Sequence, residues 1–199
     1  MLEDARRRGF LGPEPVQHHL EHSRDLAHAI GGFAGTFLDL GSGGGVPGLV
    51  LAFTWPDASA VLLDSQQRRC SFLEEAVESL GIEGRVQVAC GRAEDLARMP
   101  ELRGTVDLVV ARSFGRPAVA AECAVGFLRS GGSLVVTEPP EGTSDLVARW
   151  PSDGLRTLGL GPPVPVRSGS AGAVKMVAAG EPDDRWPRRV GRPAKSPLW

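Results

Sequence analysis

A glycine-rich turn follows a short apolar run between residues 37 and 48, where the chain reads FLDLGSGGGVPG. The positions able to shape a ligand site there are Asp39, Gly41, Gly43 and Gly45. Glycine lets the backbone turn sharply and lets a ligand approach the main chain without a Cβ in the way. The spacing suits a nucleoside cofactor with a cationic sulfonium group, whereas a dinucleotide loop wants Gly or Ala where this chain has Val46. A tight strand–helix turn that binds nothing is the alternative.

An acidic residue ends the second apolar run. Asp64 lies 23 residues after Gly41. A carboxylate there can accept hydrogen bonds from both hydroxyls of a ribose. The alternative is an acid that only favours the start of the following helix through the helix dipole. Because strand, loop, helix, strand and acid follow one another in register, we predict the ribose contact.

Polar residues also follow the third and fourth apolar runs. Ala93 and Glu94 lie in the segment GRAED, where an acceptor could bind the amino group of an adenine. The alternative is that Glu94 and Asp95 only open a helix. Arg112 follows the fourth run, at the edge of an open α/β sheet where ligands bind. We expect Arg112 to hold the cofactor or to steer an anionic substrate.

Short apolar runs alternate with amphipathic stretches from Thr36 onward, which is typical of βα units around a mostly parallel sheet. The runs are 36–40, 60–63, 86–89, 106–111 and 133–137. They lack polar alternation, as expected for strands covered on both faces. Two more strands are expected over 155–160 and 173–178, separated by a Pro/Gly-rich stretch. The prediction is an α/β fold with a doubly wound, mostly parallel, seven-stranded sheet flanked by helices.

Helical patterns fill the intervals between the runs. Residues 1–30 show helical spacing, and Ser65 can cap a helix that ends at Gly81. Pro117 suits the first turn of a helix that runs to about residue 128. No convincing element follows Glu181. The expected organisation is an N-terminal helical segment, a ligand-binding domain and a basic C-terminal tail, over 1–35, 36–180 and 181–199.

Bulk composition limits the classes of partner. The 199 residues carry a net charge of −2, so any contact with RNA must come from a local basic patch. The spacing of the three cysteines suits neither a zinc cage nor a disulfide framework, and it fits a reducing cytoplasm. No stretch reads as a signal peptide or a membrane span. We expect a cytoplasmic monomer with no membrane partner.

All four histidines fall between residues 18 and 28, and His18 and His22 lie one helical turn apart. A metal site would need a third ligand, and no matching cluster follows downstream. We therefore expect no metal. The histidines are predicted to form a helix face that packs or contacts substrate.

The C-terminal tail is basic. Its last 15 residues contain five basic side chains and no acidic one, interleaved with prolines and Trp186. Such a segment can bind RNA phosphates, and the candidates for substrate contact are Arg188, Arg189 and Lys195. A solvated terminus is the alternative.

At these motifs the sequence resembles the class I S-adenosylmethionine-dependent methyltransferases, and specifically the RsmG (GidB) family. The resemblance rests on LDLGSGGGVPGL at 38–49, VLLDSQQRRCSFLEE at 61–75, GRAEDL at 91–96, VVARSFG at 109–115 and the proline-spaced tail. It implies the class I methyltransferase sheet and S-adenosyl-L-methionine as cofactor. It also implies cofactor contacts by Gly41, Val46, Ala93, Glu94 and Arg112, with Asp64 as the ribose acid.

The sequence departs from the family at two places. Only about 35 residues precede the first strand, and the chain reads Val136-Thr-Glu138-Pro-Pro140 where the family tends to have a lysine–glycine pair after the fifth strand. An acid in place of a basic residue bears on how RNA is bound. The departures therefore concern the substrate more than the cofactor.

The resemblance implies methylation of guanine N7 in 16S ribosomal RNA. That ring nitrogen carries a lone pair and no proton, so the enzyme must align the groups and exclude water. We therefore nominate no catalytic acid or base. The alternatives are a methyltransferase that acts on a small molecule or a different RNA, and a non-catalytic nucleotide-binding module.

Overall fold

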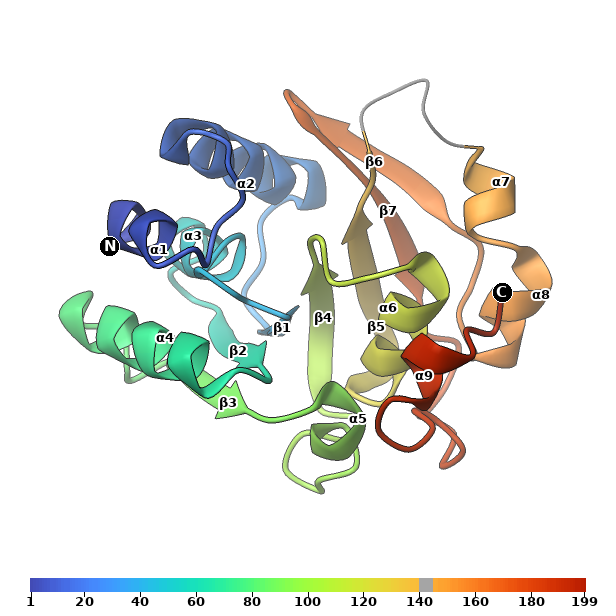
Figure 1. Cartoon of the computed structure of the whole chain (residues 1–199). Coiled ribbons are helices and arrows are strands. Elements are labelled where there is room, and N and C mark those ends of the chain that lie inside the picture. The colour runs from blue at the N-terminus through green and yellow to red at the C-terminus, as the bar shows by residue number, and fades with distance from the viewer. Residues whose placement is uncertain (140–144) are drawn as a thin grey trace.

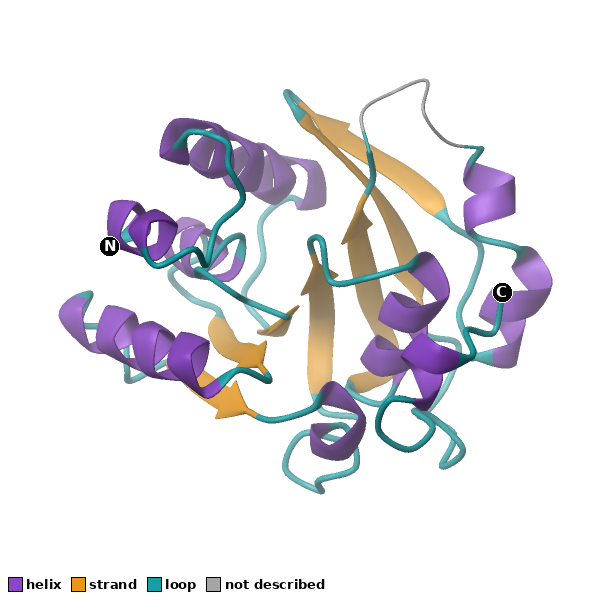
Figure 2. Ribbon diagram, viewed as in Figure 1, coloured by secondary structure: helices purple, strands orange, loops and turns teal. Residues whose placement is uncertain are grey.

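The computed structural model describes residues 1–139 and 145–199. A seven-stranded sheet forms the centre of the molecule, with strand order β3-β2-β1-β4-β5-β7-β6 (Figures 1 and 2). The strands are β1 (Thr36–Leu40), β2 (Ser59–Asp64), β3 (Val86–Cys90), β4 (Val106–Ala111), β5 (Leu128–Thr137), β6 (Val164–Ser168) and β7 (Ala171–Val177). The first five strands pair in parallel, and β7 runs antiparallel to β5 and β6. The predicted doubly wound, mostly parallel sheet is confirmed.

Helices cover both faces of this sheet (Figure 1). They are α1 (Leu2–Arg7), α2 (Val16–Ile30), α3 (Gly48–Thr54), α4 (Gln67–Ser79), α5 (Ala93–Leu96), α6 (Pro117–Val125), α7 (Leu146–Arg149), α8 (Ser152–Thr157) and α9 (Arg192–Lys195). One apolar layer joins the sheet to α2, α3 and α4, and the other joins it to α6, α8 and the C-terminal segment. The N-terminus therefore lies on one face and the C-terminus on the other.

Local patterns explain the first half of the fold. Strand β1 is buried on both faces, with Phe37, Leu38 and Leu40 fully covered. Helix α4 buries an apolar stripe, and Gly81 follows it at a φ of +64°, which favours glycine after a helix. Its N-cap is Gln66 without a side-chain hydrogen bond, so the predicted cap at Ser65 is wrong.

The second half differs from the sequence expectation. The segment predicted as a strand over 155–160 is helix α8 followed by a turn, and only Leu160 makes an isolated bridge, to Ala178. The sixth strand instead lies in the Pro/Gly-rich stretch, as β6, which pairs with β7 through residues 164–168. The C-terminal segment also contains a short helix, α9, where none was expected.

The topology determines where a ligand can bind. Strands β1 and β4 are neighbours, and the chain leaves them toward opposite sides of the sheet. A crevice opens at the carboxyl ends of parallel strands at such a switch point. The loop after β1 and the loop after β4 border this crevice.

Candidate active site

Three adjoining cavities line the carboxyl ends of the central strands. The Asp64 cavity, of about 320 Å³, is bordered by Asp64, Arg92, Ala93, Glu94 and Phe114, among others. The glycine-loop cavity, of about 240 Å³, is bordered by His19, residues 41–44, Val46, Arg69 and Arg112. The Glu138 cavity, of about 300 Å³, is bordered by His22, Arg112, Phe114, Glu138 and Arg149. Ser113 borders all three, so they form a continuous site around the end of β4.

The glycine loop owes its shape to three left-handed backbone positions. Gly41, Gly43 and Gly45 have φ angles of +80°, +55° and +87°, which residues with a Cβ rarely adopt. A Cβ on Gly41 would also lie 2.7 Å from a ring carbon of Phe114. The predicted G-x-G-x-G pattern therefore corresponds to a physical requirement at this crevice.

Asp39 stabilises the glycine loop from within the protein core. Its side chain is buried, and Oδ2 accepts a hydrogen bond of 2.9 Å from the main-chain N–H of Gly48. Burial raises the pKa of Asp39 to about 6, although hydrogen bonds from Ser42 and Gly48 oppose that rise. The acid thus joins the end of β1 to the start of α3 and does not border the three cavities.

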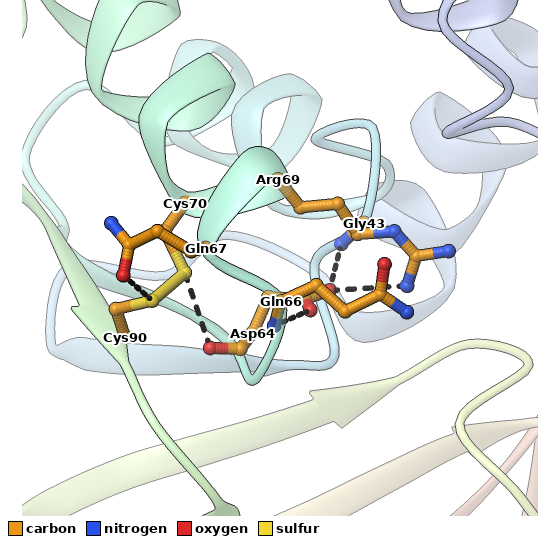
Figure 3. Close-up of a disulfide and its surroundings, with 7 residues drawn as sticks. All are labelled: Gly43, Asp64, Gln66, Gln67, Arg69, Cys70 and Cys90. Atoms are coloured by element: carbon orange, nitrogen blue, oxygen red, sulfur yellow. Dashed lines mark hydrogen bonds and ion pairs between the residues drawn. A yellow bond between two sulfur atoms is a disulfide. The ribbon is translucent and has the colours of Figure 1, made fainter.

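Asp64 lies where β2 ends and is 3% exposed (Figure 3). Its Oδ2 accepts a hydrogen bond of 2.9 Å from the N–H of Gly43, and Oδ1 accepts one of 2.9 Å from the N–H of Gln66. Nη1 of Arg69 lies 3.5 Å from Oδ2. The carboxylate therefore connects the glycine loop to the start of α4 while it borders the Asp64 cavity.

A disulfide lies directly behind this carboxylate. Cys70 of α4 is bonded to Cys90 of β3, with Cα atoms 5.8 Å apart (Figure 3). The expectation that the cysteines form no disulfide is therefore wrong for this pair, while Cys123 is free and buried. The Sγ of Cys70 lies 3.3 Å from the carbonyl oxygen of Asp64, and Cys90 immediately precedes the segment that carries Glu94. The bond thus joins two segments that border the Asp64 cavity.

Glu94 is 2% exposed and borders the same cavity. Its Oε1 accepts hydrogen bonds of 3.0 Å from Nη2 of Arg92 and of 3.0 Å from the N–H of Gly191. Burial would raise the pKa of Glu94, but the hydrogen bonds from Gly191 and Arg92 outweigh it and hold that pKa below its usual value. The carboxylate is thus ionised and able to accept a further hydrogen bond.

Arg112 is half-buried where β4 ends, between the glycine-loop and Glu138 cavities. Its Nη2 lies 2.9 Å from Nδ1 of His19, and its buried Nη1 has no partner among the described residues. The next residue, Ser113, has a φ of +55°, a strained value for a residue other than glycine. An unpaired buried guanidinium nitrogen beside a strained loop is suited to bind an anionic ligand.

Two of the four histidines of α2, His19 and His22, lie near Arg112. Burial, and then the positive charge of Arg112, lowers the pKa of both His19 and His22. His22 borders the Glu138 cavity, and its buried Nδ1 also lacks a partner among the residues described. No group of three His, Cys, Asp or Glu residues suited to a metal occurs in the described part of the chain. Of the four histidines predicted to form a helix face that packs or contacts substrate, His19 packs against Arg112 and His22 borders a cavity, whereas His18 and His28 are exposed.

The structure brings most of the predicted site residues together. The cofactor candidates that border the first two cavities are Gly41, Gly43, Val46, Asp64, Ala93, Glu94 and Arg112. The substrate candidates Arg188, Arg189 and Lys195 border none of the three cavities. Arg189 and Lys195 are exposed, whereas the Arg188 guanidinium contacts the buried Glu122 at 2.6 Å.

The sequence analysis missed several residues of the site. Arg69 borders two cavities, and its buried Nε has no partner among the described residues. Glu138 accepts hydrogen bonds of 2.7 Å from Nε of Arg149 and of 2.8 Å from Nε1 of Trp150. A signal for Arg69 was its place in the first turn of α4, five positions after Asp64. Nothing local signals the pairing of Glu138, since its partners lie beyond residues 140–144.

Comparisons with known proteins show which family this chain resembles. The family model described as rRNA small subunit methyltransferase G (GidB) matches residues 12–143. Ribosomal RNA small subunit methyltransferase G of Moorella thermoacetica is 34% identical over 83% of this chain and 70% of its own length. The protein of that name from Rubrobacter xylanophilus is 34% identical over 100% of this chain and 80% of its own length.

Solved structures share the fold. A SAM-dependent methyltransferase of Aquifex aeolicus superposes with a TM-score of 0.58 at 16% identity, covering 89% of this chain and 98% of that chain. TYW2 of Pyrococcus horikoshii, in complex with MeSAdo, superposes with a TM-score of 0.57 at 14% identity, over 85% of this chain and 65% of that chain. At such identities the likeness concerns the fold alone.

Proposed function

Because this chain belongs to the rRNA small subunit methyltransferase G family, we propose that it transfers the methyl group of S-adenosyl-L-methionine to N7 of a guanine in 16S ribosomal RNA. The observation that carries the proposal is the continuous site around β4, where a glycine loop, two carboxylates and Arg112 border adjoining cavities; Nη1 of Arg112 is buried without a partner among the described residues. These groups match the separate parts of one cofactor.

The residues present fit the cofactor. The Nη1 of Arg112 and the Nε of Arg69 are buried, without partners among the described residues, and both side chains border the glycine-loop cavity. Two such nitrogens suit the carboxylate of the methionine moiety. Asp64 would accept the ribose hydroxyls, and Ala93 and Glu94 would contact the adenine. When bound, the cofactor supplies an electrophilic methyl group on a sulfonium.

The Glu138 cavity is the proposed acceptor site. It shares Arg112, Ser113 and Phe114 with the cofactor cavities, so a base bound there would lie beside the methyl donor. Guanine N7 needs no deprotonation before it attacks, so the protein's contribution is alignment and exclusion of water. The depressed pKa of His22 keeps it neutral near neutral pH, which avoids adding a second positive charge beside Arg112 where the base becomes cationic.

A different acceptor is the second candidate. Glu138 and the proline after it occupy the place where the resemblance implies a lysine–glycine pair, and Glu138 borders the acceptor cavity. Glu138 accepts hydrogen bonds from Arg149 and Trp150 and places an acid where the resemblance implies a lysine, which favours an acceptor that is bound through fewer phosphate contacts. This observation favours a different RNA nucleotide or a small molecule.

The ribosomal substrate implies a cytoplasmic location. No helix in the described part of the chain is long and apolar enough to cross a membrane. Contact with rRNA phosphates is assigned to the exposed Arg189 and Lys195, since the Arg188 side chain is engaged by Glu122. One chain carries every residue of the proposed site, which favours a monomer.

Nucleoside mass spectrometry of 16S rRNA from cells with and without this protein tests the proposal. We expect N7-methylguanosine at one position to disappear without the protein. It should return with the wild-type gene and not with Asp64→Ala. An unchanged nucleoside profile overturns the proposal, and a change in another nucleoside selects the second candidate.

A further inference from the structure

The C-terminal segment packs against the protein as part of its core. Trp186 is 7% exposed, and its Nε1 donates a hydrogen bond of 3.1 Å to the carbonyl of Thr157. Arg103 donates hydrogen bonds of 3.1 Å to the carbonyls of Pro182 and Trp186. In Figure 1 the segment lies beside α6, on the face of the sheet opposite α2. A solvated tail would make none of these contacts.

A buried ion pair holds the next part of the segment. Glu122 of α6 is 0% exposed, and its two oxygens accept hydrogen bonds of 2.8 Å and 2.6 Å from Nε and Nη2 of Arg188. The main-chain N–H of Arg188 donates a third, of 2.9 Å, and Nη2 also donates to the carbonyl of Ser196 at 2.9 Å. A buried carboxylate is costly unless it is paired and hydrogen-bonded. Arg188 therefore fixes both ends of the stretch 188–196, which we call the C-terminal wall.

The C-terminal wall reaches the Asp64 cavity. Ala194 borders that cavity together with Asp64 and Glu94, although it lies about a hundred positions farther along the chain. Gly191, at a φ of +76°, donates its N–H to Oε1 of Glu94 at 3.0 Å. Among the described residues, Arg92 and Gly191 both donate to Oε1 of Glu94, and the side chain borders the Asp64 cavity.

We propose that the C-terminal wall forms one side of the adenine site and that the Arg188–Glu122 pair is a positioning pair for adenine recognition. The pair holds Gly191 against Glu94, which in turn presents its carboxylate to the exocyclic amino group of the base. Ala194 forms part of the lining of the same cavity. This inference rests on the proposed cofactor. It gives the C-terminal segment a role in cofactor recognition in addition to RNA binding.

The test uses nucleoside ligands without a methyl acceptor. Dissociation constants are measured by calorimetry for 5′-methylthioadenosine and for its inosine counterpart, which has a keto group in place of the amino group. The first variant is Arg188→Gln with Glu122→Gln, called the charge-pair variant, which removes both charges of the ion pair together. The second is Ala194→Phe, which fills the Asp64 cavity from an exposed position. Arg156→Gln with Asp153→Asn, which removes an exposed ion pair, and Ala179→Phe are the matched controls, at exposed positions that do not border the Asp64 cavity.

We expect wild type to prefer the adenosine ligand. The charge-pair variant should bind it about tenfold or more weakly, the range for one hydrogen bond to a charged group, and should lose most of the preference over inosine. The controls should bind as wild type does. A merely structural ion pair would lower the melting temperature without changing the ratio of the two affinities.

The outcomes separate the two proposals. If wild type binds neither nucleoside, the proposed cofactor is wrong and the inference fails with it. If wild type binds and both Ala194→Phe and the charge-pair variant match it, the inference alone is overturned. If the charge-pair variant does not fold, Ala194→Phe decides, because it leaves the ion pair intact. Unchanged nucleoside binding by Ala194→Phe contradicts the proposal that the C-terminal wall lines the adenine site, and lost binding supports it.

Discussion

The main-chain N–H of Gly43 donates a hydrogen bond of 2.9 Å to Oδ2 of Asp64, so the glycine loop after β1 and the acid at the end of β2 hold each other in place. The two residues are 21 positions apart: Asp64 ends β2, and Gly43 lies in the turn that follows the neighbouring parallel strand β1. Asp64 thus stabilises the glycine loop and is also placed to contact a ligand in the Asp64 cavity.

Replacing Asp64 with Ala is expected to weaken binding of S-adenosylhomocysteine by about 1.5–3 kcal/mol, the range for hydrogen bonds to a charged group. Calorimetry measures the change, and the exposed Asp57→Asn is the control. Unchanged affinity in a folded Asp64→Ala protein would show that the ribose does not bind there.

Replacing Arg112 with Gln should separate the two ends of the cofactor. We expect S-adenosylhomocysteine to bind about tenfold or more weakly, because its carboxylate loses a charged partner. Methylthioadenosine has no carboxylate, so its affinity should stay near the wild-type value. The exposed Arg116→Gln is the control. Equal losses for both ligands would place Arg112 elsewhere than at the carboxylate.

Asp39 should make the stability of the protein fall as pH rises. Burial raises its pKa to about 6, so the folded state binds more protons than the unfolded state between about pH 4 and pH 6. The stabilising contribution is present below pH 4 and is lost by about pH 6, a loss on the order of 3 kcal/mol. Denaturant unfolding across this range should show that decline in wild type relative to Asp39→Asn. If the free energies of unfolding of the two proteins change in parallel with pH, the raised pKa of Asp39 is contradicted.

Removing the Cys70–Cys90 bond should lower the free energy of unfolding. The bond closes a loop with a sequence separation of 20, for which chain entropy gives about 3 kcal/mol. Cys70→Ser with Cys90→Ser should therefore melt at a lower temperature than oxidised wild type. Dithiothreitol should lower the melting temperature of wild type similarly and leave the double variant unchanged. If the melting temperature falls only in the double variant and not in reduced wild type, the loss comes from the serine side chains. The disulfide would then add nothing to stability.

Exposed basic residues of the C-terminal segment should set the salt dependence of RNA binding. Each lost phosphate contact reduces the slope of log K against log salt by about 0.7–0.9. Arg189→Gln with Lys195→Gln should therefore flatten the slope measured with 16S rRNA fragments and spare cofactor affinity. Arg7→Gln with Arg24→Gln, at exposed positions of α1 and α2, is the control. An unchanged slope in the first variant would remove the segment from the RNA contact.

Local sequence determined much of the cofactor half of this protein. The strands ending at Leu40, Asp64 and Ala111, the glycine loop and Arg112 follow from apolar runs and from residues that only a tight turn accepts. The local pattern was less informative after residue 150. The apolar residues there, Leu155, Leu158 and Leu160, fit either a strand or a helix, because a run this short does not distinguish the two-residue period of a strand from the 3.6-residue period of a helix.

Contacts between distant segments were decided only by the tertiary structure. Arg188 reads as a basic tail residue, yet Glu122, 66 positions earlier, holds it against α6. His19 and Arg112 are 93 positions apart, and Cys70 meets Cys90 because α4 returns the chain to β3 beside β2. Such pairs depend on complementary charge, shape and distance, which no periodicity along the chain records. The sequence therefore nominated most residues of the candidate site, and the folded structure decided which of them share a cavity.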